Sequence, residues 1–184
     1  MKLGSDRLIL RPWQESDRSP FAAMSADSAV MQYLRALPTR EACDAWVDYQ
    51  IAHQNEHGFC LWAVELRGSA AFVGAVGLLH VSFSASFTPA IEIGWRLARD
   101  AWGQGLATEA ARAALAFGFA DLALDEIVAY AAPPNQASQN VMKKLGMSRD
   151  EAGDFDHPRV APGGALRRQA LYRIARKKWF SASD

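Results

Sequence analysis

The chain has 184 residues, half of them hydrophobic and 22% charged, and its formal net charge is zero. This length and balance are typical of a globular protein, and we expect one domain over residues 1–184. The zero net charge argues against direct nucleic-acid binding. The lack of a long apolar run or a signal-peptide pattern argues against a membrane segment and favours a cytoplasmic protein.

In the first half of the chain, strand and helix signals alternate. Strands are expected at residues 7–12, 59–66 and 71–79, and short helices are expected from residue 15 and over 27–34. The longest predicted helix begins at the N-cap Thr39 and ends at Gly58. Its predicted apolar stripe consists of Ala42, Trp46, Tyr49 and Ala52.

The second half is predicted to begin with a loop over 81–89 and a strand over 90–97. A helix follows to about residue 119, then a strand at 127–131, a helix from Asn135 to Gly146, a loop over 154–164 and a last strand over 166–175. Strands that first pair locally and then flank helices predict a mixed α/β (α+β) class with a largely antiparallel sheet.

The most informative stretch is the strand at 90–97 and the glycine turn that follows it. Gly103 and Gly105 interrupt the strand pattern, and helical spacing resumes at Leu106. The first backbone N–H groups of a helix have no internal partner and lie at the positive end of its dipole, so they can bind an anion. Because glycine permits close approach to the backbone, we expect a phosphate-bearing ligand at residues 102–108.

Four interpretations of this turn compete: three kinds of phosphate ligand and a turn that binds nothing. A nucleotide P-loop would need a lysine, which the sequence Gly105-Leu106-Ala107-Thr108 lacks. A dinucleotide fingerprint would need a third glycine where Thr108 stands. The pyrophosphate of coenzyme A stays open, and so does a glycine turn that binds nothing.

The segment resembles the most characteristic motif of the GCN5-related N-acetyltransferase (GNAT) superfamily, Q/R-x-x-G-x-G/A between a strand and a helix. Asp100 stands at the first motif position, where Gln or Arg is usual. Two further segments, residues 5–12 and 135–147, resemble the branch that contains the ribosomal-protein N-terminal acetyltransferases (RimJ/RimL-like). The order and spacing of the three motifs match from about residue 5 to 180.

This resemblance implies a GNAT-like fold with helices on both faces of the sheet and an N-acetyltransferase that uses acetyl-CoA. The acceptor would be a primary amine, on a protein N-terminus or a small molecule, that attacks directly in a ternary complex. A catalytically weak acyl-CoA-binding sensor or interaction protein is the alternative. Coenzyme contacts are expected from the strand, the turn and the later helix, at Trp95, Arg96, Leu97, Trp102, Gly103, Gln104, Gly105, Leu106, Ala107, Thr108, Asn135, Asn140 and Lys143.

Two residues are candidates for catalysis. Glu92 lies on the opposite strand face from Ile91 and Ile93, where the family often carries a carboxylate, and it is the candidate base for the amine. Many family members place a tyrosine seven residues after the asparagine to protonate the thiolate, but this chain has Met142 there. Ser138 is the alternative donor. Alternatively, Glu92 is a solvated strand residue or pairs with an arginine, and the Ser138 hydroxyl only bonds the helix backbone.

A zinc motif and a dimer are the remaining possibilities. His53 and His57 match H-x-x-E-H, but Gly58 ends the helix at once, and the cysteines Cys43 and Cys60 are isolated, so we expect no metal. The resemblance and the aromatic-rich composition favour a homodimer.

Overall fold

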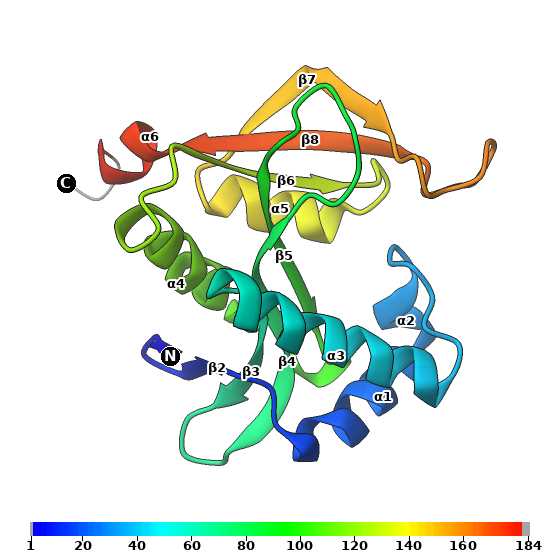
Figure 1. Ribbon diagram of the computed structural model, residues 1–184, viewed down its shortest axis with the longest axis vertical. Coiled ribbons are helices and arrows are strands. Elements are labelled where there is room, and N and C mark those ends of the chain that lie inside the picture. The colour runs from blue at the N-terminus through cyan, green and yellow to red at the C-terminus, as the bar shows by residue number, and fades with distance from the viewer. Residues whose placement is uncertain (1, 182–184) are drawn as a thin grey trace. The chain divides into compact units, whose positions relative to one another are not determined.

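The computed structural model describes residues 2–181. Its strands form one eight-stranded sheet in the order β1-β2-β3-β4-β5-β6-β8-β7 (Figure 1). The strands are β1 (Leu3–Gly4), β2 (Leu8–Arg11), β3 (Leu61–Leu66), β4 (Ala71–His80), β5 (Ile91–Leu97), β6 (Glu126–Ala131), β7 (Ser148–Asp156) and β8 (Arg168–Ala175). β5 pairs with β6 in parallel, whereas β1–β2, β2–β3, β3–β4, β6–β8 and β7–β8 are antiparallel. The predicted mixed, largely antiparallel class is confirmed.

Helical elements occupy the connections between these strands. They are η1 (Glu15–Asp17), α1 (Arg18–Ala26), α2 (Ser28–Met31), α3 (Arg40–His57), η2 (Arg99–Ala101), α4 (Leu106–Ala120), α5 (Gln136–Lys144) and α6 (Arg176–Ser181). Within residues 2–181, every helix is too short or too polar to cross a bilayer.

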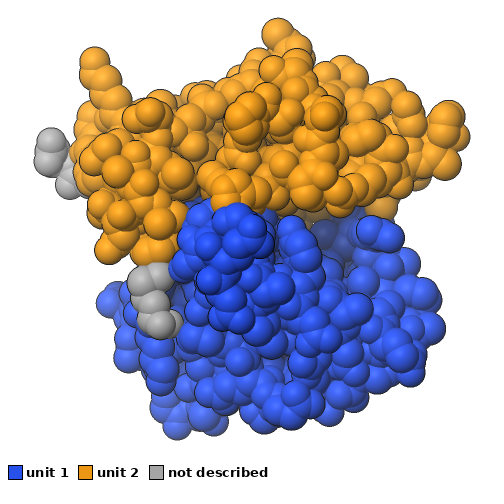
Figure 2. Space-filling model, viewed as in Figure 1, with its two compact units in different colours: residues 1–79, 94–114 blue, residues 80–93, 115–184 orange. Residues whose placement is uncertain are grey.

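The chain divides into two compact units, which Figure 2 shows in different colours. Unit 1 consists of residues 1–79 and 94–114, and unit 2 consists of residues 80–93 and 115–184. A single folding domain over 1–184 stays a prediction.

Helix α3 of unit 1 begins and ends as predicted but buries a different face. Thr39 accepts a hydrogen bond from the Ala42 N–H, and Gly58 adopts a left-handed conformation with φ 83°. The predicted stripe is wrong, because Tyr49 is 44% exposed and the buried residues are Cys43, Val47, Gln50 and His53. Two of these are polar and bond the backbone: Gln50 Oε1 accepts from Leu61 N, and His53 Nδ1 lies 2.7 Å from Phe59 O. These bonds satisfy the Gln50 oxygen and the His53 Nδ1, whereas the buried Gln50 Nε2 has no hydrogen-bond partner among residues 2–181.

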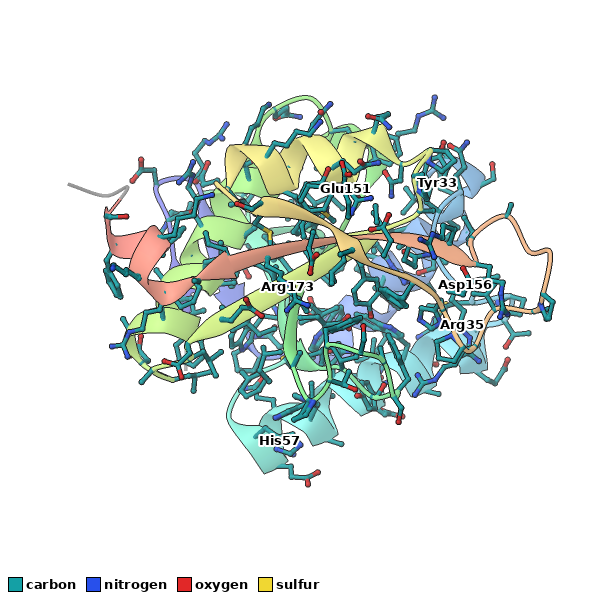
Figure 3. The ribbon with its side chains drawn as sticks, turned by 90° about the horizontal axis from the view of Figure 1, so that it is seen from above. Tyr33, Arg35, His57, Glu151, Asp156 and Arg173 are labelled. Atoms are coloured by element: carbon teal, nitrogen blue, oxygen red, sulfur yellow. The ribbon has the colours of Figure 1, made fainter. Side chains whose placement is uncertain are left out.

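Strand β7 of unit 2 begins before the loop predicted over 154–164 and overlaps its first residues. Its sequence is mostly polar, so it lacks the alternation of apolar and polar residues that predicts a strand. Ion pairs stabilise it as the edge strand instead: Arg149 pairs with Asp154, and Arg173 of β8 lies 2.6 Å from Asp150. Figure 3 labels Arg173 on β8.

Candidate active site

In unit 1, the predicted glycine turn connects η2 to α4. Gly103 and Gly105 have φ values of 74° and 78°, which residues with a side chain rarely adopt. A Cβ at Gly103 would meet nothing within 4 Å, and at Gly105 it would meet only the Arg7 Nη2 at 3.7 Å. The predicted strand, glycine turn and helix therefore follow one another, and the backbone of the turn is open in front of α4.

The N-terminal segment is bonded to this turn, a contact that the sequence did not reveal. Arg7 Nη2 donates to the Gln104 carbonyl at 3.1 Å and lies 2.6 Å from Glu109 Oε2 of α4. The Ser5 hydroxyl and the Arg7 N–H also donate to Glu109. Partial burial opposes ionisation of Glu109, but these bonds outweigh it and lower the pKa of the carboxyl. The N-terminal motif and the glycine-turn motif are thus hydrogen-bonded to each other, with the Arg7 guanidinium beside Gly105.

The other predicted coenzyme residues of unit 1 lie along β5 and the turn. Trp102 is 47% exposed, and its Nε1 donates to the Leu97 carbonyl at 2.9 Å. Gln104 Nε2 donates to the Asp100 carbonyl, so the unusual aspartate supports the turn through its backbone. Trp95, Arg96, Ala107 and Thr108 are half-buried, and Leu97 and Leu106 are buried.

In unit 2, Glu92 of β5 lies beside Tyr130 of β6. Glu92 is opposite Val128 in the parallel pairing, and Tyr130, two residues further along β6, hydrogen-bonds its carboxyl group. Burial raises the pKa of Glu92 to about 7, while the Tyr130 bond and the positive charge of Arg159 oppose this rise. A carboxylate with a pKa near neutrality is suited to general-base catalysis. The sequence alone does not indicate Tyr130, because only the register between β5 and β6 places it beside Glu92.

An aromatic cluster surrounds Tyr130. Its ring packs edge-on to Phe155 at 5.2 Å and to Phe83 at 6.0 Å, and Phe83 lies 4.6 Å from the His157 ring. Phe87 packs against the same group from the 81–89 segment. Burial and the neighbouring Glu92 carboxylate raise the pKa of Tyr130, so its phenol keeps its proton and can donate to that carboxylate.

Helix α5 holds the remaining predicted residues of unit 2. Asn135 is its N-cap, and Asn135 Oδ1 accepts from the Ser138 N–H at 3.1 Å. Ser138 is half-buried in the first turn, whereas Met142, at the position of the usual tyrosine, is 1% exposed and belongs to the core. Asn140 and Lys143 are exposed. The capping role of Asn135 is therefore present, and it is compatible with ligand contact.

The two histidines of the H-x-x-E-H sequence lie together in unit 1. The predicted helix end at Gly58 is confirmed, yet the His53 and His57 ring centroids are only 4.5 Å apart. Burial lowers the pKa of His53, which favours the neutral ring that a metal requires.

The absence of a metal therefore stays a prediction that needs direct measurement. We expect zinc well below one equivalent after dialysis against a mild chelator, by mass spectrometry of the metal content. His53→Gln and His57→Gln should leave this trace content unchanged. Stoichiometric zinc in the wild-type protein, lost in both variants, would overturn the expectation.

Comparison with known proteins places the chain in a family. Residues 7–148 match the family model of the acetyltransferase (GNAT) domain. The FsC-acetyl coenzyme A-N(2)-transacetylase of Aspergillus fumigatus is 33% identical over 186 residues, which cover 96% of this chain and 77% of that protein. A solved GNAT-family acetyltransferase from Bacillus anthracis is 27% identical with a TM-score of 0.78, covering 96% and 99% of the two chains.

A more distant solved structure shares the fold. It is a RimL ribosomal L7/L12 α-N-protein acetyltransferase in complex with coenzyme A, 17% identical, with a TM-score of 0.76 over 95% of this chain and 98% of that one. Enzymes of the matched family use acetyl-CoA as the acyl donor. The chain therefore belongs to the GNAT family and is an acyltransferase.

Proposed function

We propose that this protein transfers the acetyl group of acetyl-CoA to a primary amine, by direct attack within a ternary complex. The acceptor is a protein N-terminus or a small-molecule amine. The observation that carries the proposal is the open glycine turn in front of α4, with backbone N–H groups suited to a pyrophosphate and no P-loop lysine. The name of the fungal relative, an acetyl-coenzyme A transacetylase, supports the same donor.

In the proposed complex, residues 102–108 bind the pyrophosphate through their backbone. The backbone of Trp95, Arg96 and Leu97 bonds the pantetheine amides and polarises the thioester oxygen. Asn135, Asn140 and Lys143 of α5 supply further contacts to the coenzyme. Arg7 adds a positive charge beside the turn, since its guanidinium lies next to Gly105.

The proposed chemistry needs one proton to leave the amine and one to reach the sulfur. Glu92 accepts the proton of the acceptor, directly or through water, as the nitrogen bonds to the acetyl carbon and the carbon–sulfur bond breaks. The Ser138 hydroxyl donates a hydrogen bond to the departing thiolate, which is then protonated with solvent as the source. Tyr130 donates a hydrogen bond that holds Glu92 in place and limits the rise in the Glu92 pKa.

The alternative is an acyl-CoA-binding protein with little turnover, which Met142 in place of the usual tyrosine favours. A thiol-release assay with acetyl-CoA and a panel of primary amines, including peptide N-termini, separates the two. We expect amine-dependent release of free coenzyme A together with the acetylated amine in a mass spectrum. Tight acetyl-CoA binding without turnover on any amine would support the sensor instead.

A further inference from the structure

Two connecting segments of unit 2, residues 81–90 and 157–167, are bonded to each other. The first leads from β4 into β5, and the second connects β7 to β8. Arg159 Nη2 donates to the Ser82 carbonyl at 2.5 Å and to the Ser82 hydroxyl at 3.0 Å. Because the two residues are 77 positions apart, this arginine joins distant parts of the chain.

Each of the two segments is also closed by a hydrogen bond of its own. The Val81 N–H donates to the Ala90 carbonyl at 3.0 Å, and the His157 N–H donates to the Arg167 carbonyl at 2.7 Å. The Arg159 guanidinium therefore has a defined position, since both segments that it joins are held at their ends.

Further contacts lead from Arg159 to the candidate base. The Arg159 N–H donates to His157 Nδ1 at 3.2 Å, and the centroid of the His157 ring lies 4.6 Å from that of Phe83. Phe83 packs edge-on to the Tyr130 ring at 6.0 Å, and Tyr130 hydrogen-bonds the Glu92 carboxyl group. Arg159 thus belongs to the same group of packed side chains as Glu92, entirely within unit 2.

The Glu92 carboxyl group feels one nearby cation. Burial raises its pKa, and the Tyr130 hydrogen bond and the positive charge of Arg159 oppose the rise. The 81–90 segment carries no ionisable side chain. Arg159 is therefore the cation on this side of the molecule that favours the ionised carboxylate.

Other arginines of unit 2 are occupied by carboxylates. Arg173 of β8, labelled in Figure 3, pairs with Asp150 at 2.6 Å and Glu126 at 2.7 Å. Arg168 lies 3.6 Å from Asp156. Arg159, in contrast, forms no ion pair within residues 2–181, so no carboxylate at short range cancels its charge.

We propose that Arg159 is a positioning residue for Glu92: its bonds to Ser82 fix the guanidinium near the carboxyl group, and its charge favours the form that accepts a proton. The proposal rests on the proposed role of Glu92 as the general base. Arg159 is exposed, so solvent screens its charge, and the expected effect is smaller than that of a buried ion pair.

The first test is a pH–rate profile at saturating acetyl-CoA. Arg159→Met removes the cation, so Glu92 should stay protonated to higher pH and the rising limb of the rate should move to higher pH. A move of about half a unit would lower the rate roughly threefold at about pH 6 and leave it nearly unchanged at about pH 9. The amine titrates equally in both proteins, so its own ionisation cancels in the ratio of the rates.

Two further variants distinguish a charge effect from a structural one. Arg159→Lys keeps the charge and should bring the limb back toward its wild-type position. Arg168→Met removes another exposed arginine near the 157–167 segment and should leave the limb where it is. Equal loss of rate in Arg159→Lys and Arg159→Met at every pH would show a structural role and overturn the proposal. Should Arg159→Met not fold, the neutral Arg159→Gln takes its place with the same expected limb.

A direct titration of Glu92 separates this proposal from the proposed function. Carbon-13 NMR of the glutamate carboxyl groups, with the Glu92 signal identified by its loss in Glu92→Gln, needs no turnover. The titration midpoint should be higher in Arg159→Met than in the wild type and unchanged in Arg168→Met. Equal midpoints in Arg159→Met and the wild type would overturn the proposal. If the midpoint moves but Glu92→Gln keeps the wild-type rate, the link between Arg159 and Glu92 is supported and the role of Glu92 as the base fails.

Discussion

Glu92→Gln is expected to lower the rate of acetyl transfer by about a hundredfold, typical for loss of one general base. Glutamine keeps the shape and a hydrogen bond to Tyr130 but cannot accept the proton of the amine. The affinity for acetyl-CoA, measured by calorimetry, should be nearly intact, because the carboxylate is proposed to act on the acceptor. Loss of affinity without loss of rate at saturation would contradict this role.

If Glu92 is the general base, the rate of acetyl transfer should also change with pH in a defined direction. Glu92 acts only when deprotonated, and burial raises its pKa to about 7, so the wild-type rate at saturating acetyl-CoA should rise with pH along a limb centred near 7. An alkyl amine titrates at roughly 8 to 10, so the ratio of wild-type to variant rates should be greatest between pH 7 and the pKa of the amine. The Glu92→Gln profile should lack the limb near pH 7.

Two companion variants sharpen the assignment. Tyr130→Phe removes the bond that lowers the pKa of Glu92, so the rising limb should move to higher pH. Glu151→Gln changes an exposed glutamate of β7, labelled in Figure 3, and should leave the profile as it is. A wild-type profile in Glu92→Gln would show that Glu92 is structural and that water or another group deprotonates the amine.

Gly105→Val is expected to weaken acetyl-CoA binding at least tenfold, about 1.4 kcal/mol. The valine side chain would occupy the open space in front of the turn, where the pyrophosphate is proposed to approach the backbone. Calorimetry on the folded variant measures the effect. Unchanged affinity would place the coenzyme elsewhere.

Backbone strain must be separated from this steric effect. Gly105 has a φ of 78°, so valine there also costs about 1–2 kcal/mol of folding free energy. Gly68→Val is the matched control, since Gly68 has a φ of 85° in the turn before β4 and a Cβ there meets nothing within 4 Å. Both variants should lose similar stability in chemical unfolding, and only Gly105→Val should lose coenzyme affinity.

Local signals in the sequence were enough to predict the elements that carry the proposed coenzyme site. The turn at Gly103 and Gly105 could be recognised because glycine, which has no Cβ, adopts a positive φ without strain wherever it stands. Thr39 and Asn135 could be recognised because an N-cap bonds an N–H only three residues away. Such effects act between residues that are close in the sequence, so the sequence alone reveals them.

Tertiary structure decided what surrounds those elements. Arg7 and Glu109 are 102 residues apart, and Glu92 meets Tyr130 only through the register of β5 and β6. The buried face of α3 includes Gln50 and His53 because backbone groups of the segment that follows the helix bond these two side chains. Polar contacts between distant residues leave no periodic pattern in a sequence, so the raised pKa of Glu92 became visible only in the folded chain.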